Sequence, residues 1–172
     1  MCPVSRTSDC PEAQGAGSNI TSVNDYIKWA KAVMNCESSI TEEIYKVLIQ
    51  LRTVQNPSFE DLPSMTSSVA YAAGWEVYYY RGYMVVSHHG AVSGFGSCHS
   101  FLPEIKFSVV ILGNPDDGGT LAFIMMREFI DEILQVPEIE RPDWNQFVSE
   151  DHSDRESEYE KLRQKLCPGI KE

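Results

Sequence analysis

The stretch VVSHHGAVSGF, residues 85–95, joins a β-branched apolar run to two adjacent histidines and then to closely spaced glycines. The two valines favour a β-strand, whose side chains alternate between two faces with a period of two. His88 and His89 should therefore point to opposite faces, so that only one of them can face a pocket. Gly90 has no side chain and lets another backbone approach closely. We expect this strand to form one wall of a functional site.

The segments on either side of this stretch have the pattern of antiparallel hairpins. AGWEVYYYRGYMVVSHHG, residues 73–90, predicts two strands joined by a tight turn at Arg81 and Gly82. Farther along, GSCHSFL (96–102) and FSVVILGN (107–114) flank PEIK, whose proline suits a turn and not a ladder. Four consecutive antiparallel strands are predicted, in a sheet of the α+β class.

Three segments have apolar residues at helical spacing and predict helices that pack with this sheet. The first begins at Ser22, which can cap a helix with Asp25 three residues on, and the second spans about 41–51. The third is expected to be capped by Thr120 and to run to Gln135. The predicted apolar faces are Val23, Tyr26, Ile27, Ala30, Val33 and Met34, then Ile44, Val47, Leu48 and Leu51, then Leu121, Met125, Phe129, Ile130 and Ile133, and the polar stripe of the third helix is Arg127, Glu128, Asp131 and Glu132.

Composition suggests three regions along the chain. Residues 1–19 are rich in Pro, Gly, Ser and Ala and predict an irregular lead-in, and residues 20–137 predict the folded domain. Within it, residues 52–68 carry two prolines and many small polar residues, which predicts a long connection. Residues 138–172 are a charged, partly helical extension, with a weak apolar face at Tyr159, Leu162 and Leu166.

The charge of the chain argues against several kinds of partner. The formal net charge is -11 and the pI is near 4.8. Binding nucleic acid requires clustered Lys and Arg, and anionic membrane surfaces attract the same residues, so neither partner is expected. No apolar run reaches the length of a membrane span, and no hydrophobic signal region follows the first residues. A cytoplasmic protein is expected from the chain as given.

The five cysteines are widely scattered and form no Cys-x-x-Cys pair, which predicts reduced thiols. Cys98 stands beside His99, as a catalytic cysteine could. Neighbours on a strand face opposite sides, however, so burial of Cys98 in the core is the favoured interpretation.

A metal site is the other reading of the histidines. His88, His89 and His99 could bind a metal together with Asp116 and Asp117. Adjacent histidines diverge on a strand, and no ligand pair has the i, i+2 or i, i+4 spacing. The glycines after the two aspartates lack a phosphate-binding pattern. We therefore predict no metal and no cofactor.

Three blocks, taken in order, resemble a known family: GAGSNITSVNDYIKW (15–29), GWEVYYYRGYMVVSHHGAVSGF (74–95) and FLPEIKFSVVILGN (101–114). They are similar to the β-lactamase-related serine hydrolases, a penicillin-binding-protein-like group that includes class C β-lactamases, D-amino-acid-type peptidases, esterases and transesterases. The resemblance is strongest to the fungal branch and covers roughly residues 15–167. It implies acyl transfer on an ester or amide, with a small-molecule acyl substrate.

The resemblance also assigns roles to the opening stretch. The family's third motif is Lys-Thr-Gly or His-x-Gly on the strand that lines the site, and His88-His89-Gly90 matches the second form. His88 would then face the site, anchor the polar end of the substrate and support proton transfer. Gly90 would let the substrate dock against the backbone, and Ala91 would supply an oxyanion N–H. His89 would take the variable middle position.

Two motifs of the family are missing from these 172 residues. The nucleophile and its base lie in Ser-x-x-Lys, one helical turn apart, and Tyr-x-Asn follows; neither occurs here. The chain thus resembles the C-terminal half of the catalytic domain alone, and a truncated protein, inactive by itself, is expected. The alternative is a pseudoenzyme or binding module for an acyl metabolite or a partner protein. A half-domain would also expose an apolar face, which predicts self-association.

Overall fold

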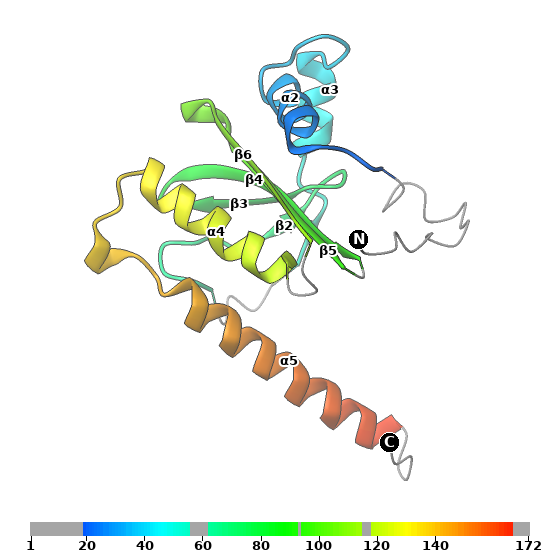
Figure 1. The fold of residues 1–172 in the computed structure, drawn as a ribbon, viewed down its shortest axis with the longest axis vertical. Helices are drawn as coiled ribbons and strands as arrows, with labels where there is room; N and C mark the ends of the chain where they lie inside the picture. The colour runs from blue at the N-terminus through cyan, green and yellow to red at the C-terminus, as the bar shows by residue number, and fades with distance from the viewer. Residues whose placement is uncertain (1–18, 56–61, 93, 115–117, 167–172) are drawn as a thin grey trace. The chain divides into compact units, whose positions relative to one another are not determined.

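A computed structural model gives the fold of the chain (Figure 1). Its contacts gather in two compact units, Met1–Met126 and Arg127–Glu172. Within the described residues, no helix is both long enough and apolar enough to cross a membrane. The structure describes residues 19–55, 62–92, 94–114 and 118–166.

One six-stranded antiparallel sheet dominates the first unit, and its strands are ordered as they follow in the chain. This confirms the predicted α+β class with its two consecutive hairpins. Two further short strands precede the hairpins, and one of them lies in the segment predicted as a long connection. There Thr53 pairs with Tyr71, which in turn pairs with Glu76. The strands are β1 (Thr53–Val54), β2 (Ala70–Tyr71), β3 (Glu76–Tyr80), β4 (Tyr83–Val92), β5 (Phe95–Leu102) and β6 (Phe107–Gly113).

The turn between β3 and β4 falls at the predicted dipeptide. Arg81 has φ of 50° and Gly82 has φ of 85°, and two consecutive positive φ angles are the signature of a type I′ hairpin turn. Glycine adopts positive φ angles without steric strain, whereas a residue with a Cβ adopts them at an energetic cost. The turn fixes the register in which Val77 faces Val86, and through it the position of the histidines on β4.

Replacing the second turn residue should therefore weaken the hairpin. We expect Gly82→Ala to lower the free energy of unfolding by about 1 kcal/mol, because the new Cβ meets no atom but forces a strained φ. Gly82→Asn should cost less, since asparagine tolerates the left-handed region. Urea denaturation followed by circular dichroism compares the two variants; equal losses would show that backbone strain is not the cause.

The second hairpin also has its predicted form. A 3-10 turn, η2 (Pro103–Ile105), connects β5 to β6, and Lys106 completes it with φ of 54°. The long pairing between β5 and β6 runs from Gly96 opposite Gly113 to Leu102 opposite Phe107.

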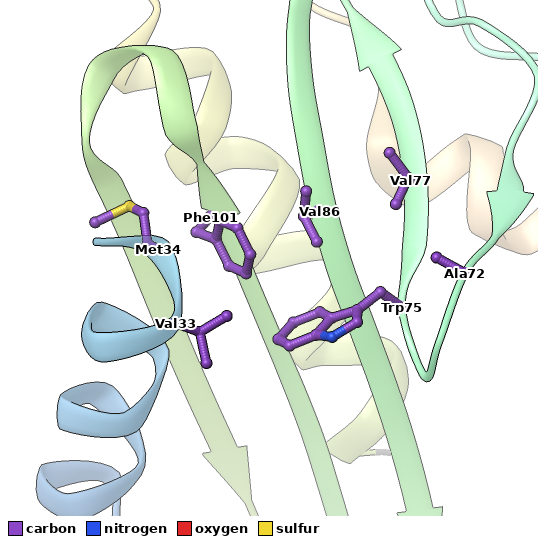
Figure 2. Packing of buried hydrophobic residues seen from close by; sticks show 7 residues of the cluster. All are labelled: Val33, Met34, Ala72, Trp75, Val77, Val86 and Phe101. Atoms are coloured by element: carbon purple, nitrogen blue, oxygen red, sulfur yellow. The ribbon is translucent and has the colours of Figure 1, made fainter. Parts of the chain in front are cut away.

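Helix α2 (Val23–Met34) begins at the predicted cap, where the Ser22 side chain accepts a hydrogen bond from the Asp25 backbone N–H. The helix packs against β5 and β6. Figure 2 shows Val33 and Met34 of α2 beside Phe101 of β5, with the Trp75 indole extending toward them. This cluster is the hydrophobic core beneath the helix, and its members are Val33, Met34, Ala72, Trp75, Val77, Val86 and Phe101.

Helix α3 (Glu42–Ile49) forms where a second helix was predicted, but its packing face is rotated from the expected stripe. Tyr45, Leu48 and Ile49 pack against the core cluster. Ile44, Val47 and Leu51 are exposed, although they were predicted to belong to a core helix. The helix has only eight residues, so its contact with the core is narrow and only part of the apolar stripe can be buried.

Helix α4 (Gly118–Ile133) corrects the third helix prediction. It starts before Thr120, which therefore lies inside its first turn and not at its cap. Arg127 and Asp131, predicted for the solvent side, are buried, and so is Ile130. Most of the apolar face predicted to cover the sheet is exposed instead: Leu121, Met125, Phe129 and Ile133.

Contacts with Trp144 explain why Asp131 and Arg127, both in the second unit, are buried. Its indole N–H donates a hydrogen bond of 2.7 Å to the Asp131 carboxylate, and the Arg127 guanidinium lies 5.1 Å from its ring centroid. A buried charge is tolerated when it is hydrogen-bonded or stacked on an aromatic face, as these two are. Trp144 opens helix α5 (Trp144–Leu166), the helix predicted in the charged extension. The face expected at Tyr159, Leu162 and Leu166 is exposed.

Candidate active site

Strand β4 places His88 directly opposite His99 of β5, and paired residues of an antiparallel ladder project to the same face. The two imidazole rings lie 6.2 Å apart with an angle of 25° between their planes. Val86, two residues before His88 and on the same side of the strand, belongs to the core cluster beneath α2. His88 is therefore at the end of the face that α2 covers.

The His88 ring contacts the side chain of Tyr71. Its hydroxyl lies 3.1 Å from Nε2 of His88. Burial is the main cause that lowers the pKa of His88 from its ordinary value, although the nearby carboxylate of Glu76 and a hydrogen bond to the His89 backbone act in the opposite direction. Because the net pKa shift is downward, His88 is a neutral hydrogen-bonding group at pH 7.

His99 is more deeply buried, with 5% of its surface exposed. Its Nδ1 atom lies 2.7 Å from the hydroxyl of Tyr26 on α2. Burial, reinforced by His88, lowers the pKa of His99 to about 4, and burial raises the pKa of Tyr26 to about 12. Both groups are therefore neutral across the physiological range, and the pair joins α2 to β5 without a charge.

Aromatic rings surround His99 on this face. The Trp75 ring centroid is 4.9 Å from that of His99 in an edge-on arrangement, and Trp29 stacks on Trp75 at 5.6 Å with 7° between the planes. Trp29 keeps 45% of its surface exposed. His88, whose ring lies 6.2 Å from that of His99, thus adjoins an aromatic surface that begins in the core and ends at solvent.

His89 has a different set of neighbours, as the alternation of the strand predicted. Its Nδ1 atom is 3.5 Å from a carboxylate oxygen of Glu76, and its ring centroid is 6.4 Å from that of Phe123. More than half of its side chain is exposed. The two histidine rings are nonetheless 6.1 Å apart, and Glu76 acts on both. What distinguishes them is that His88 lies beside Tyr71 and His99, whereas His89 lies beside Phe123.

Gly90 and Ala91 lie where β4 runs past the end of β3. The ladder between β3 and β4 ends with Glu76 opposite Ser87, whereas the ladder between β4 and β5 continues to Val92. Among the described strands, Gly90, Ala91 and Val92 thus have a strand neighbour on one side only. Such an edge can pair with the backbone of an extended ligand.

The glycine at position 90 also has a packing reason. A Cβ there would lie 3.2 Å from Oγ of Ser97, whose hydroxyl donates a 3.4 Å hydrogen bond to the Gly90 carbonyl oxygen. The Cβ of Ala91 approaches the position that a Cβ on Gly119 would take, at 3.5 Å. A side chain at position 90 would therefore require the Ser97 hydroxyl to shift, whereas a Cβ at position 119 would make an ordinary contact with Ala91.

Other chemistry suggested by the sequence finds no further support in the part of the chain that the structure describes. That part contains no group of three His, Cys, Asp or Glu side chains able to hold a metal ion. Asp116 and Asp117 lie outside the described residues. Cys98 is buried, as expected of a core cysteine.

Tyr26, Tyr71 and Trp75 were not identified as site residues from the sequence, and His99 was considered only as a metal ligand or as the neighbour of a catalytic Cys98. Tyr26 was expected in the apolar face of its helix, because a tyrosine at that spacing is as well explained by packing. Tyr71 belongs to a two-residue strand with no periodicity to mark it. No local signal reveals that either hydroxyl meets a histidine.

Comparisons with known proteins found relatives similar in sequence and one solved structure similar in fold. No protein-family profile matches the chain. It is 35% identical over 156 residues to the unguisins hydrolase ungD of Aspergillus violaceofuscus (strain CBS 115571), a match that covers 80% of this chain and 26% of that protein. It is 30% identical over 162 residues to the unguisins hydrolase ungD' of Aspergillus campestris (strain IBT 28561), covering 93% of this chain and 30% of that protein. The chain therefore spans less than a third of the length of these relatives.

A solved structure shares the fold. The octameric penicillin-binding protein homologue from Pyrococcus abyssi superposes with a TM-score of 0.51 at 21% identity, covering 64% of this chain and 24% of that one. At that identity the likeness concerns the fold alone. The chain therefore shares a fold with part of that protein.

Proposed function

We propose that the chain supplies the His88 wall of an acyl-transfer site that acts on an ester or amide. The observation that carries this proposal is the placement of His88 beside the one-sided edge at Gly90 and Ala91. A neutral imidazole and an open strand edge can bind the polar end and the backbone of an acyl substrate together. The resemblance to β-lactamase-related hydrolases supports the same assignment.

In this proposal each group has a defined role. His88 anchors the polar end of the substrate by way of the Tyr71 hydroxyl at its Nε2, and supports proton transfer during acyl transfer. Gly90 leaves room for the substrate backbone. The N–H of Ala91 meets the oxyanion that forms when the acyl carbon is attacked.

The 172 residues contain neither Ser-x-x-Lys nor Tyr-x-Asn, so we propose that the chain alone does not hydrolyse its substrate. The names of its relatives make unguisins the first compounds to test. Self-association stays a prediction, and the exposed apolar side chains of Ile44 and Val47 on α3, and of Leu51 just after it, support it.

The test separates binding from turnover. We expect the purified chain to show no burst of product with p-nitrophenyl esters or nitrocefin, because the family's nucleophile motif is missing. Unguisins or p-nitrophenyl esters should raise its melting temperature, and His88→Ala should abolish that rise. His89→Ala is the matched control and should keep the response, since the His89 ring lies beside Phe123, whereas the His88 ring lies beside Tyr71 and His99.

The second candidate function is a binding module that never takes part in acyl transfer. The chain's missing nucleophile motif favours it, and ligand stabilisation without turnover in any longer relative of the chain would support it. An acyl-enzyme trapped on one serine of this chain would overturn both the predicted inactivity and the binding module. No response to any acyl compound would contradict the acyl-binding wall itself.

A further inference from the structure

Both ring nitrogens of His88 are engaged by groups of the protein. Nε2 faces the Tyr71 hydroxyl at 3.1 Å. The His89 backbone accepts a hydrogen bond from the ring, and Nδ1 is the nitrogen left to donate it, because Nε2 faces the phenol. A neutral imidazole has one N–H and one lone pair, so these two partners together select one tautomer.

We propose that Tyr71 is a positioning residue that fixes His88 in the Nδ1–H tautomer, with the Nε2 lone pair held by the tyrosine hydroxyl. The relevance of this to acyl transfer rests on the proposed function, but the proposal itself concerns two side chains of the chain. Tyr71 lies on β2 and His88 on β4, so the bond also ties a two-residue strand to the candidate site.

Tyr71 and His88 meet close to the end of β3. Tyr71 is the last residue of β2 and pairs with Glu76, the first residue of β3, which in turn pairs with Ser87. His88 is the next residue on β4, just beyond the end of β3. The ring centroids of Tyr71 and His88 are 6.1 Å apart at an angle of 64°, an edge-on approach that directs the phenol oxygen to the imidazole.

The fixed tautomer would determine which ring nitrogen of His88 can take up a proton. With Nδ1–H committed to the backbone, the ring can take up a proton only at Nε2, and that atom is reached through the Tyr71 hydroxyl. Glu76, which acts on His88 electrostatically, favours the protonated ring. Tyr71 therefore stands between His88 and any group that exchanges a proton with it.

A second tyrosine–histidine pair provides an internal control. Tyr26 contacts His99 at 2.7 Å on the same face, but through Nδ1 and from α2. If Tyr71 acts through its hydroxyl, then Tyr71→Phe should change His88 and leave His99 as it was. Tyr26→Phe should do the reverse.

The experiment is long-range nitrogen–proton NMR of the histidine rings, recorded from pH 5 to 8 on the chain labelled with 15N-histidine. Wild type should show His88 as the Nδ1–H tautomer. In Tyr71→Phe the Nε2–H form should grow, and the midpoint of His88 titration should rise by roughly half a pH unit or more, since the lost bond stabilised the neutral ring. Tyr26→Phe should leave both properties of His88 unchanged.

An unchanged tautomer and midpoint in Tyr71→Phe would overturn the proposal. Should that variant fail to fold, 3-fluorotyrosine placed at position 71 replaces it, because the more acidic phenol is a stronger donor and should lower the midpoint of His88. A midpoint that does not move would count equally against the idea. The measurement uses no substrate, so positioning by Tyr71 can stand even where the chain binds no acyl compound, the result that would defeat the proposed function.

Discussion

Trp75→Ala should lower the free energy of unfolding by about 3–5 kcal/mol, the range observed when a buried aromatic side chain is truncated. Trp75 has 3% of its surface exposed and belongs to the core cluster beneath α2. Its ring meets Phe101 at 5.2 Å and His99 at 4.9 Å, and Trp29 stacks on it. Truncation would leave a cavity at the point where helix, sheet and candidate site meet.

Urea denaturation followed by far-ultraviolet circular dichroism measures this loss without depending on tryptophan fluorescence. Phe95→Ala is the matched control, because Phe95 starts β5 but has 47% of its surface exposed. It should cost less than about 1 kcal/mol. Similar losses in the two variants would mean that burial in the core cluster is not what makes Trp75 important.

The same variant tests the link between core and site. Because Trp75 touches His99, and His99 lies opposite His88, its loss should also weaken ligand stabilisation at the His88 wall. Residues that pack with a site often act on it through position alone.

The sheet could be predicted from the sequence because its signals are local. The turn at Arg81 and Gly82 and the proline after β5 each specify a connection between neighbouring strands. The alternation along β4 then follows from the period of two, and it accounts for the position of His88 beside His99 and of His89 beside Phe123. Local turn chemistry and periodicity were sufficient for this part of the fold.

The orientation of the helices could not be predicted in the same way. A helical stripe identifies an apolar face, but it does not say which tertiary partner is available to cover it. In α4 the buried side includes Arg127 and Asp131, because a tryptophan that comes later in the chain pairs with both. A partner from a distant part of the chain can thus stabilise a buried polar side chain that the helical stripe places on the solvent side.

The candidate site shows the same division. His88, Gly90 and Ala91 were identified from one contiguous motif, and the structure places them on one strand. Tyr71 and Tyr26 come from a short strand and a helix, at 17 and 73 residues from the histidines they contact. Such pairs depend on register and on helix placement, which a single sequence does not display.

Stability should fall as the pH drops from 7.5 to 5, and His99 should account for much of the loss. In the folded chain the pKa of His99 is lowered to about 4, against 6.5 for an exposed histidine. At pH 7.5, one unit above the unfolded-state pKa of 6.5, the side chain is almost entirely neutral in both states and contributes almost nothing to the pH dependence. Between 6.5 and 4 the unfolded chain takes up a proton that the folded chain cannot, so acid favours unfolding. The loss should be on the order of 2 kcal/mol at pH 5 and about 3 kcal/mol near pH 4.

His99→Gln isolates this contribution, since glutamine can still bond the Tyr26 hydroxyl but does not titrate. Urea denaturation gives the free energy of unfolding of wild type and variant at pH 7.5 and at pH 5. In the difference between their two pH-dependent losses, the contributions of His88 and of the carboxylates largely cancel. The variant should be less stable than wild type at pH 7.5, where it loses packing, yet lose about 2 kcal/mol less on acidification. If acidification lowered the free energy of unfolding equally in both proteins, His99 would have to accept a proton readily in the folded state. Its burial beneath Tyr26 and Trp75 could then not be what keeps this face of the sheet uncharged.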